Sequence, residues 1–375
     1  MKKISLLKIK RLAAVILCLL LAVTVFSYRD YLVSPIRTLS AEIGRFSALS
    51  LMPQAAAPKQ EPQQTAPADA GVQTTKSQEE SAQTTRPSVT SPETTVAAPT
   101  TGTDKVLEVV SDAAGKIYEQ VIGNSGATNH VDNVYIRNTT GKTVDFAAEL
   151  EKGTDVSVQT NAAPQVLIVH THATECFFPG ISDVYSASWP SRSTDNNLNM
   201  ISIGAVVAKR LNEAGIMTVQ ATVQHDKDAY NGSYDRSRET IQSYLEKYPS
   251  IQVILDLHRD AITSDNGTKT KPTVTINGKK AAQLMIVSGC ESGSVTNYPD
   301  WIYNLRFALQ IQKTCSDLYP SLARPLMFAS RHYNQDITHG TLLIEMGSEA
   351  NTHNEVVYTA ELLSDVLVRV FNSNA

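Results

Sequence analysis

Two histidines and a glutamate follow a short apolar run near the middle of the chain. The stretch VLIVHTHATECF places His170 and His172 two residues apart and Glu175 three residues further on. Because side chains alternate between the two faces of a strand, both imidazoles are expected on one face. Neutral imidazole and carboxylate are ligands that suit zinc, and a catalytic zinc site usually keeps an open position for water. The spacing favours a metal site, although a lone histidine at a strand end is more often an ordinary hydrogen-bonded residue.

Two further apolar runs end in residues of the same kinds. VILDL continues into His258-Arg259-Asp260, and TLLI continues into Glu345. Ligand sites in open α/β sheets form outside the carboxyl ends of the strands, so parallel neighbouring strands would bring these ends together. A carboxylate beside such a metal can take the proton from an attacking water. The alternative for Glu345 is a structural salt bridge, for example to Arg259, because a buried unpaired carboxylate is costly.

The elements that must position these residues alternate between strand and helix. Apolar runs typical of strands span residues 165–170, 216–223, 250–258 and 340–347. Helical spacing is found over residues 195–215, 234–248, 297–320 and 354–371. A hairpin turning at Asn277-Gly278 is predicted within 271–289. The pattern predicts an α/β fold with a mostly parallel sheet and helices on both faces, forming a catalytic domain over 164–375.

The chain before residue 164 divides into three segments of different composition. Residues 1–34 carry basic residues ahead of an uncharged stretch, which predicts a transmembrane anchor or a signal sequence. No clear cleavage site follows, which favours an uncleaved anchor with the rest of the chain outside the membrane. Residues 35–104 are a low-complexity linker, predicted to be disordered because they contain too little apolar surface. Residues 105–163 are predicted to form a small capping region.

Within this capping region the sequence predicts four short elements. Helical spacing covers residues 105–123, and strand-like runs cover 133–140 and 155–160. Residues 145–153 fit either a short helix or a strand.

Overall composition limits the classes of function. The chain has 33 basic and 37 acidic residues, so neither nucleic-acid binding nor a polyanionic tail is indicated. Its four cysteines have no CxxC spacing, which argues against a disulfide framework or a cysteine-rich zinc site.

Six stretches between residues 164 and 372 carry a family resemblance. They are VLIVHTHATE (166–175), YNGSYDRSRETI (230–241), PSIQVILDLHRDA (249–261), NYPDWIYNLRFALQIQ (297–312), YPSLARPL (319–326) and RHYNQDITHGTLLIEMGSEANT (331–352). On these the chain resembles the stage II sporulation protein P family, peptidoglycan hydrolases of the sporulation engulfment machinery. The membrane anchor and polar linker are similar to those of the family.

The resemblance extends to zinc-dependent N-acetylmuramoyl-L-alanine amidases of the third amidase class. It implies that His172 and His258 are metal ligands and that Glu345 is the catalytic glutamate. Those amidases take a further ligand from a glutamate just before a helix that begins Asn-Leu, whereas this chain has Arg-Ser-Thr-Asp over 192–195. Glu175 is the expected replacement, Asp195 the second candidate and His170 the third. If His170 is not a ligand, it is expected to hold a ligand or a substrate carbonyl.

Other residues near these motifs have two interpretations each. Arg259 is expected to orient the substrate or Glu345, or else to form a strand-end ion pair. Tyr333, Asn334 and Gln335 are candidates for binding substrate amides, although a polar turn explains them equally well.

The resemblance implies an extracytoplasmic, membrane-anchored enzyme with a Zn²⁺ cofactor and peptidoglycan as substrate. It would cleave the amide between N-acetylmuramic acid and L-alanine during septal wall thinning and engulfment. The resemblance also implies endopeptidase activity on peptide crosslinks. The implied partners are the sporulation D and M proteins. The rival hypotheses are a non-catalytic wall-binding scaffold and a metallopeptidase outside wall metabolism, although the HExxH motif of zinc peptidases is absent.

Overall fold

The computed structural model describes residues 97–373, apart from residues 101, 108–111 and 161–162. Two sheets are present in this part of the chain, one of eight strands and one of four. The predicted anchor at 1–34 and most of the predicted linker lie outside the described residues. Across the described ranges, no helix is long and apolar enough to cross a membrane.

The eight-stranded sheet has the order β2-β3-β11-β10-β12-β7-β4-β6. Its strands are β2 (Asn129–Val131), β3 (Val134–Asn138), β4 (Val166–Val169), β6 (Thr218–Gln220), β7 (Val253–Asp260), β10 (Leu284–Gly289), β11 (Leu326–Ala329) and β12 (Gly340–Ser348). Only the β2–β3 and β10–β12 pairs are antiparallel among the strand pairs of this sheet. The mostly parallel α/β sheet predicted from the sequence is therefore confirmed.

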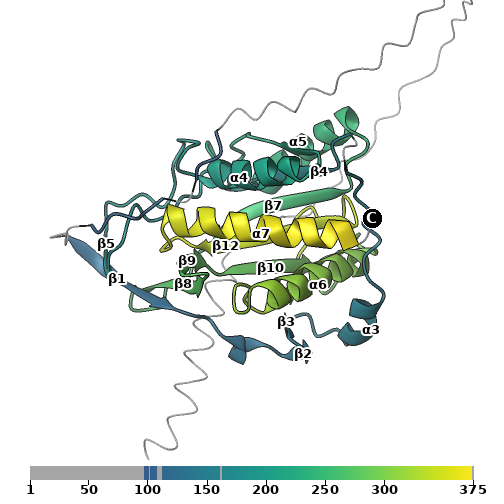
Figure 1. Ribbon diagram of the computed structural model, residues 1–375, viewed down its shortest axis with the longest axis horizontal. Helices are drawn as coiled ribbons and strands as arrows, with labels where there is room; N and C mark the ends of the chain where they lie inside the picture. Colours follow the sequence, from purple (N-terminus) through teal and green to yellow (C-terminus); the bar gives the residue numbers. More distant parts are fainter. Residues whose placement is uncertain (1–96, 101, 108–111, 161–162, 374–375) are drawn as a thin grey trace, which may run out of the picture.

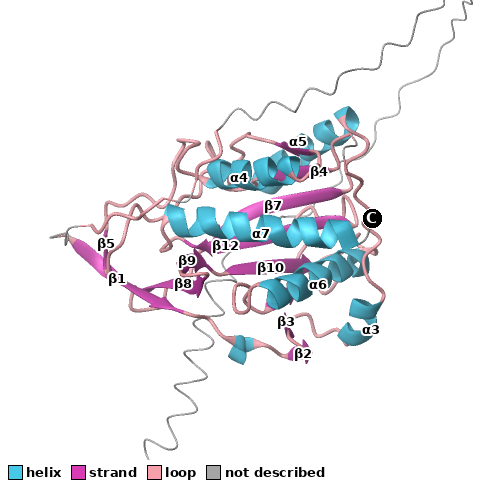
Figure 2. Cartoon of the chain, viewed as in Figure 1, coloured by secondary structure: helices cyan, strands magenta, loops and turns pink. Residues whose placement is uncertain are grey.

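Helices cover both faces of this sheet, as predicted. Three of them, α4 (Met200–Glu213), α6 (Trp301–Leu318) and α7 (His353–Ser373), pack in one core with inward residues such as Leu255 and Ile344. Figures 1 and 2 show these three helices in front of the strands. The fourth, α5 (Ser233–Lys247), packs through Ile241 against Leu167 and Ile254 on the opposite face. The short α3 (Phe146–Glu151) sits beside α6, where Arg306 Nε donates to Glu149 Oε2.

The four-stranded sheet has the order β5-β1-β8-β9 and lies at the left of Figure 1. It contains β1 (Ala113–Gln120), β5 (Val184–Ser186), β8 (Lys269–Ile276) and β9 (Lys279–Ala282). The predicted hairpin forms between β8 and β9, where Asn277 and Gly278 both have positive φ, 48° and 77°. Such angles are required at both central positions of a type I′ turn. Residues 124–126 add one short 3-10 turn.

Two expectations for the capping region are wrong. The helix expected over 105–123 is replaced by β1, because that segment pairs with β5 and β8 instead of closing on itself. Within β1, Ile117 is buried while the next residue, Tyr118, is exposed. The strand expected over 155–160 does not form, although Val156 and Val158 are buried. The expected strand at 133–140 is confirmed as β3, which joins the large sheet beside β11.

Candidate active site

Three neighbouring parallel strands bring the predicted residues to one edge of the large sheet. The strands β12, β7 and β4 lie side by side in that order. The register places His258 of β7 opposite Glu345 of β12, and Asp256 of β7 opposite Val169 of β4. Because β4 ends at Val169, the loop after it carries His172 to the level of His258. The predicted convergence of these strand ends is therefore present in the fold.

The imidazoles of His172 and His258 face each other at the centre of the site. Their ring centroids are 5.3 Å apart and their planes are perpendicular, at 90°. Tyr230 stacks on His172 with centroids 4.3 Å apart, and Tyr234 meets the same ring edge-on at 5.7 Å. Burial, together with the positive charges of His258 and Arg192, lowers the pKa of His172 to about 2. His172 is therefore neutral, which is the form of imidazole that binds metal ions.

His258 stands between two carboxylates. Glu175 Oε2 is 3.8 Å from its Nδ1, and Asp256 Oδ1 is 2.9 Å from its Nε2. Burial lowers the pKa of His258, but the carboxylates of Asp256, Glu175 and Glu345 outweigh that effect and raise it to about 9. Asp256 lies off the line of the ring N–H, so neither ring nitrogen has an aligned hydrogen bond within the described chain.

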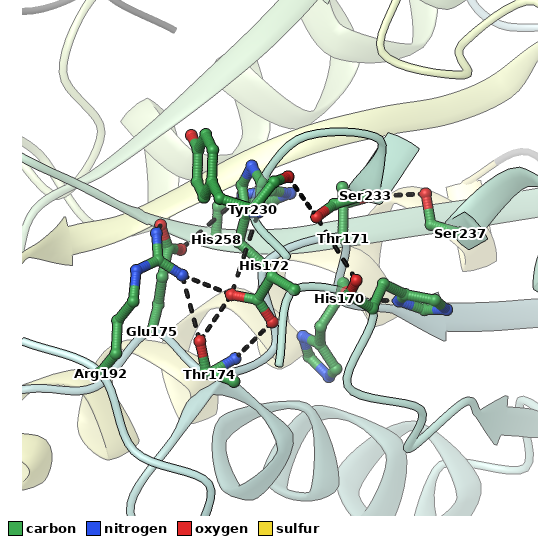
Figure 3. Close-up of polar contacts among 12 residues, drawn as sticks. His170, Thr171, His172, Thr174, Glu175, Arg192, Tyr230, Ser233, Ser237 and His258 are labelled. Atoms are coloured by element: carbon green, nitrogen blue, oxygen red, sulfur yellow. Dashed lines mark hydrogen bonds and ion pairs between the residues drawn. The ribbon is translucent and has the colours of Figure 1, made fainter. Parts of the chain in front are cut away.

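Glu175 lies in the loop after β4 and is held next to His258, as Figure 3 shows. Arg259 N donates to its Oε2 at 3.2 Å, and Arg192 Nη2 lies 3.6 Å from its Oε1. Arg192 also forms an ion pair with Asp226, which accepts hydrogen bonds from Thr174 N and Oγ1. These contacts fix the loop on both sides of Glu175 and direct its carboxylate toward His258.

Glu345 is buried beside His258 on the same face of the sheet. Its Oε2 has no hydrogen-bond partner among the described residues. Burial and the negative charges of Asp260 and Glu175 raise its pKa to about 8, although His258 and Arg324 oppose that rise. Arg324 is tied to Asp260 by a 2.9 Å hydrogen bond from Nη1 to Oδ2. Glu345 is thus a carboxylate that can hold or release a proton near neutral pH.

His170 is not brought into this group. Its Nδ1 lies 3.1 Å from Leu257 O and its Nε2 lies 3.0 Å from Gln220 Nε2, so both ring nitrogens are occupied. The ring packs against α4, where a Cβ added at Gly204 would lie 2.5 Å from His170 Nε2. The expectation that His170 and His172 share a face is wrong, because the strand ends at Val169 and the alternation ends with it. By contacting Leu257 O, His170 supports the strand that presents His258.

Arg259 occupies a different place from the one its predicted role requires. It follows His258 on β7, so its side chain leaves the opposite face of the strand. Its Nε donates to Cys176 O and its Nη2 to Ser191 O. The alternative ion pair with Glu345 does not form among the described residues. Arg259 instead fastens the loop that carries Glu175 to the end of β7.

The remaining residues predicted from the sequence make their contacts with parts of the chain other than the two histidines. Asp195 is exposed in the turn before α4 and accepts hydrogen bonds from Asn197. Gln335 bonds to the backbone at Gly289 N and Val287 O, and Asn334 donates to Tyr234 O. Tyr333 stacks on Tyr234 with centroids 5.2 Å apart, which places its ring near the site.

Sequence reasoning missed two acidic residues that lie beside His172 and His258. Asp226 Oδ2 is 4.0 Å from His172 Nδ1, and Asp256 contacts His258 as described above. Both could have been found from position alone. Asp226 follows shortly after β6, a fourth parallel strand at the same edge, and Asp256 precedes His258 by two residues, which puts both side chains on one face of β7.

The residues present have the donor chemistry of a zinc site. Across the described residues, no group of three or more His, Cys, Asp or Glu side chains is already arranged to hold a metal ion. Yet His172 Nδ1 and both ring nitrogens of His258 are buried without hydrogen-bond partners there, which is costly unless something binds them. Glu175 is a better candidate ligand than Asp226, because both oxygens of Asp226 already accept hydrogen bonds from Thr174 or Arg192.

Together the fold and the site define an α/β protein with two histidines and several carboxylates gathered at the carboxyl ends of parallel strands. The model of the Stage II sporulation protein P family matches residues 35–368 of the chain. The chain belongs to this family.

A curated relative and several solved structures are similar to the chain. Stage II sporulation protein P from Bacillus subtilis (strain 168) is 27% identical over 217 residues, which cover 55% of this chain and 51% of that protein. The chain thus matches about half the length of this curated relative.

Two solved structures illustrate the structural likeness. One is the apo form of the N-acetylmuramyl-L-alanine amidase of Mycobacterium abscessus, with 13% identity, a TM-score of 0.31, and coverage of 57% of this chain and 99% of that chain. Another is the CwlD amidase of Clostridioides difficile in complex with the GerS lipoprotein, with 9% identity, a TM-score of 0.34, and coverage of 56% and 99%. Likeness at these scores supports no conclusion about function.

Proposed function

We propose that the chain is a zinc-dependent N-acetylmuramoyl-L-alanine amidase that hydrolyses peptidoglycan during sporulation. Membership of the Stage II sporulation protein P family supports this role. The observation that carries the chemistry is the meeting of His172, His258 and Glu175 with the buried carboxylate of Glu345 at adjacent strand ends. Of the sequence hypotheses for the carboxylate ligand, the surroundings of Glu175 favour it over Asp195.

In this proposal His172, His258 and Glu175 hold the zinc ion. When bound, zinc would act as a Lewis acid toward the amide carbonyl and would lower the pKa of a water molecule. Glu345 would take the proton from the attacking water and return it to the departing nitrogen of L-alanine. Its raised pKa, about 8, suits a group that must both accept and donate a proton near neutral pH.

The surrounding residues have supporting roles. Tyr230 and Tyr234 pack on the ring of His172 and shield it from water. Arg192 and Arg259 hold Glu175 from two sides, and Arg324 limits the negative charge near Glu345. Excluding water strengthens each electrostatic interaction within such a site.

We further propose that residues 1–34 anchor the chain in the cell membrane and that the domain acts outside the cytoplasm. The linker before residue 105 would give it reach toward the wall. The sporulation D and M proteins are proposed partners, and cleavage of peptide crosslinks is a proposed second activity. These proposals rest on the family and on the sequence before residue 97.

Muropeptide analysis tests the function directly. Full-length protein is incubated with purified peptidoglycan, and the products are separated and identified by mass spectrometry. We expect free stem peptides beginning with L-alanine and glycan strands without peptides. We also expect the purified protein to contain one bound zinc ion. We expect Glu345→Gln to abolish these products. Glu349→Gln is the matched control, because Glu349 is also buried but binds Ile262 N and Lys269 Nζ.

The outcome separates the rival functions. A wall-binding scaffold would bind peptidoglycan without releasing either product, and it would be unaffected by Glu345→Gln. A metallopeptidase would cut only between amino acids, so that L-alanine stays attached to the glycan and no free stem peptide beginning with L-alanine is released. Either result would overturn the proposal.

A further inference from the structure

Asp256 is a buried carboxylate on β7 that faces the candidate site and has no role in the proposed reaction. It lies two residues before His258, so both side chains leave the same face of the strand. Its Oδ1 is 2.9 Å from His258 Nε2, and both residues are almost fully withdrawn from solvent. Glu175 approaches the same ring from the other nitrogen, at 3.8 Å from Nδ1. Each nitrogen of His258 therefore has its own carboxylate.

Hydrogen bonds from the neighbouring strand end hold Asp256 in place. The backbone N–H of Thr171 donates to Asp256 Oδ1 at 2.9 Å, and its hydroxyl donates to Oδ2 at 2.7 Å. Thr171 Oγ1 is also 2.8 Å from Ser237 Oγ on α5. Figure 3 shows Thr171 between the site and Ser237. Because Thr171 immediately precedes His172, Asp256 connects the loop carrying one histidine to the strand carrying the other.

We propose that Asp256 is a positioning residue that fixes the ring of His258, with Nε2 held toward Asp256 and Nδ1 left for the metal ion. This inference rests on the proposed function, in which His258 is a zinc ligand. A histidine that binds a metal usually donates its other ring N–H to a carboxylate or carbonyl, and loss of that partner weakens metal binding by about 10–100-fold. Neither ring nitrogen has an aligned hydrogen bond among the described residues, but Nε2 is 2.9 Å from Asp256 whereas Nδ1 faces Glu175, the other proposed ligand, at 3.8 Å. Nδ1 is therefore the nitrogen that such an arrangement would leave for the metal.

Zinc affinity, not catalysis, is the readout that isolates this role. The dissociation constant of zinc is measured on the full-length protein, by competition with a chromophoric chelator at one pH. We expect Asp256→Ala to weaken zinc binding by about 10–100-fold. Asp256→Asn keeps the volume and an acceptor for Thr171 but removes the charge, so it replaces the alanine variant if that variant does not fold.

Two controls separate positioning from stability. Thr171→Val removes the hydroxyl that contacts Asp256 and Ser237 but leaves the carboxylate beside His258. We expect it to lower the unfolding temperature and to leave zinc affinity unchanged. Glu349→Gln, at a buried carboxylate that does not contact either histidine, is expected to leave zinc affinity unchanged as well.

Each result bears on the inference in a defined way. Wild-type affinity in the Asp256 variants would overturn it, and so would equal weakening in Thr171→Val, because loop geometry alone would then explain the loss. If His258→Ala abolishes zinc binding while the Asp256 variants bind normally, only this inference fails. If zinc binding survives His258→Ala, the proposed metal site and this inference fail together.

Discussion

The buried carboxylate of Glu345 should make the protein less stable as the pH rises. Its pKa is raised from 4.5 to about 8 in the folded state, chiefly by burial and by the negative charges of Asp260 and Glu175. Between these values the folded protein keeps a proton that the unfolded chain has released. The contribution of Glu345 to stability is therefore greatest below pH 4.5 and falls until the pH passes about 8. Glu345→Gln removes this dependence because glutamine does not ionise.

The size of the effect follows from the shift in pKa. One pKa unit corresponds to about 1.36 kcal/mol, so the shift from 4.5 to about 8 gives an upper limit of roughly 5 kcal/mol. Because Glu345 and His258 attract each other, their titrations are coupled. Part of this free energy therefore belongs to the pair and not to Glu345 alone. We expect Glu345→Gln to gain about 1–3 kcal/mol relative to wild type between pH 5 and pH 8.

Urea unfolding of the chelator-treated, full-length protein at several pH values measures this difference. Glu349→Gln is the control, because the pKa of Glu349 is shifted in the opposite direction. Burial alone would raise the pKa of Glu349, but Arg259 and Lys269 and hydrogen bonds lower it overall. Its stabilising contribution is present above the unfolded pKa and is lost as the pH falls through the folded pKa, so that variant should be less stable by a constant amount from pH 5 to pH 8. A constant difference between Glu345→Gln and wild type would refute the reasoning.

Three further predictions concern the ion pair, the helix contact and the metal. Arg324→Met leaves the buried Asp260 without its partner and should lower the free energy of unfolding by about 3–5 kcal/mol in urea, whereas Arg324→Met with Asp260→Asn should recover much of that loss. Gly204→Ala puts a methyl group against the ring of His170 and should cost about 1–3 kcal/mol in the same assay, without changing zinc affinity. Zinc at about 1,000 times its dissociation constant should stabilise the protein by about 4 kcal/mol, and a chelator should reverse this; an unchanged unfolding temperature would contradict the proposed site.

The strand ends could be predicted from sequence because their signal is local and repeated. His258 and Glu345 each follow a continuous apolar run, and such runs are the pattern of strands buried on both faces. Parallel order then places their ends at one edge, which is a consequence of topology and not of sequence separation. The structure agrees, because His258 and Glu345 occupy paired positions of β7 and β12.

The elements that sequence reasoning missed depend on contacts between distant segments. The segment 113–120 has helical spacing, yet it becomes β1 because β5 and β8 satisfy its backbone hydrogen bonds. Likewise, β11 is only four residues long and follows Pro325, so its apolar run was too short to separate from the loop before it. Local propensity could not reveal either pairing.

The loop after β4 shows why the choice among ligands required the structure. On an extended strand His170 and His172 would point the same way, whereas here they diverge, and Glu175 reaches the site from a turn. Two carboxylates fix this turn. Asp256 accepts hydrogen bonds from Thr171, and Asp226 accepts them from Thr174. Both carboxylates come from strand ends or loops at the same edge, on either side of β4. The direction of the Glu175 side chain is therefore set by contacts with neighbouring strands, and it cannot be predicted from the spacing of the motif alone.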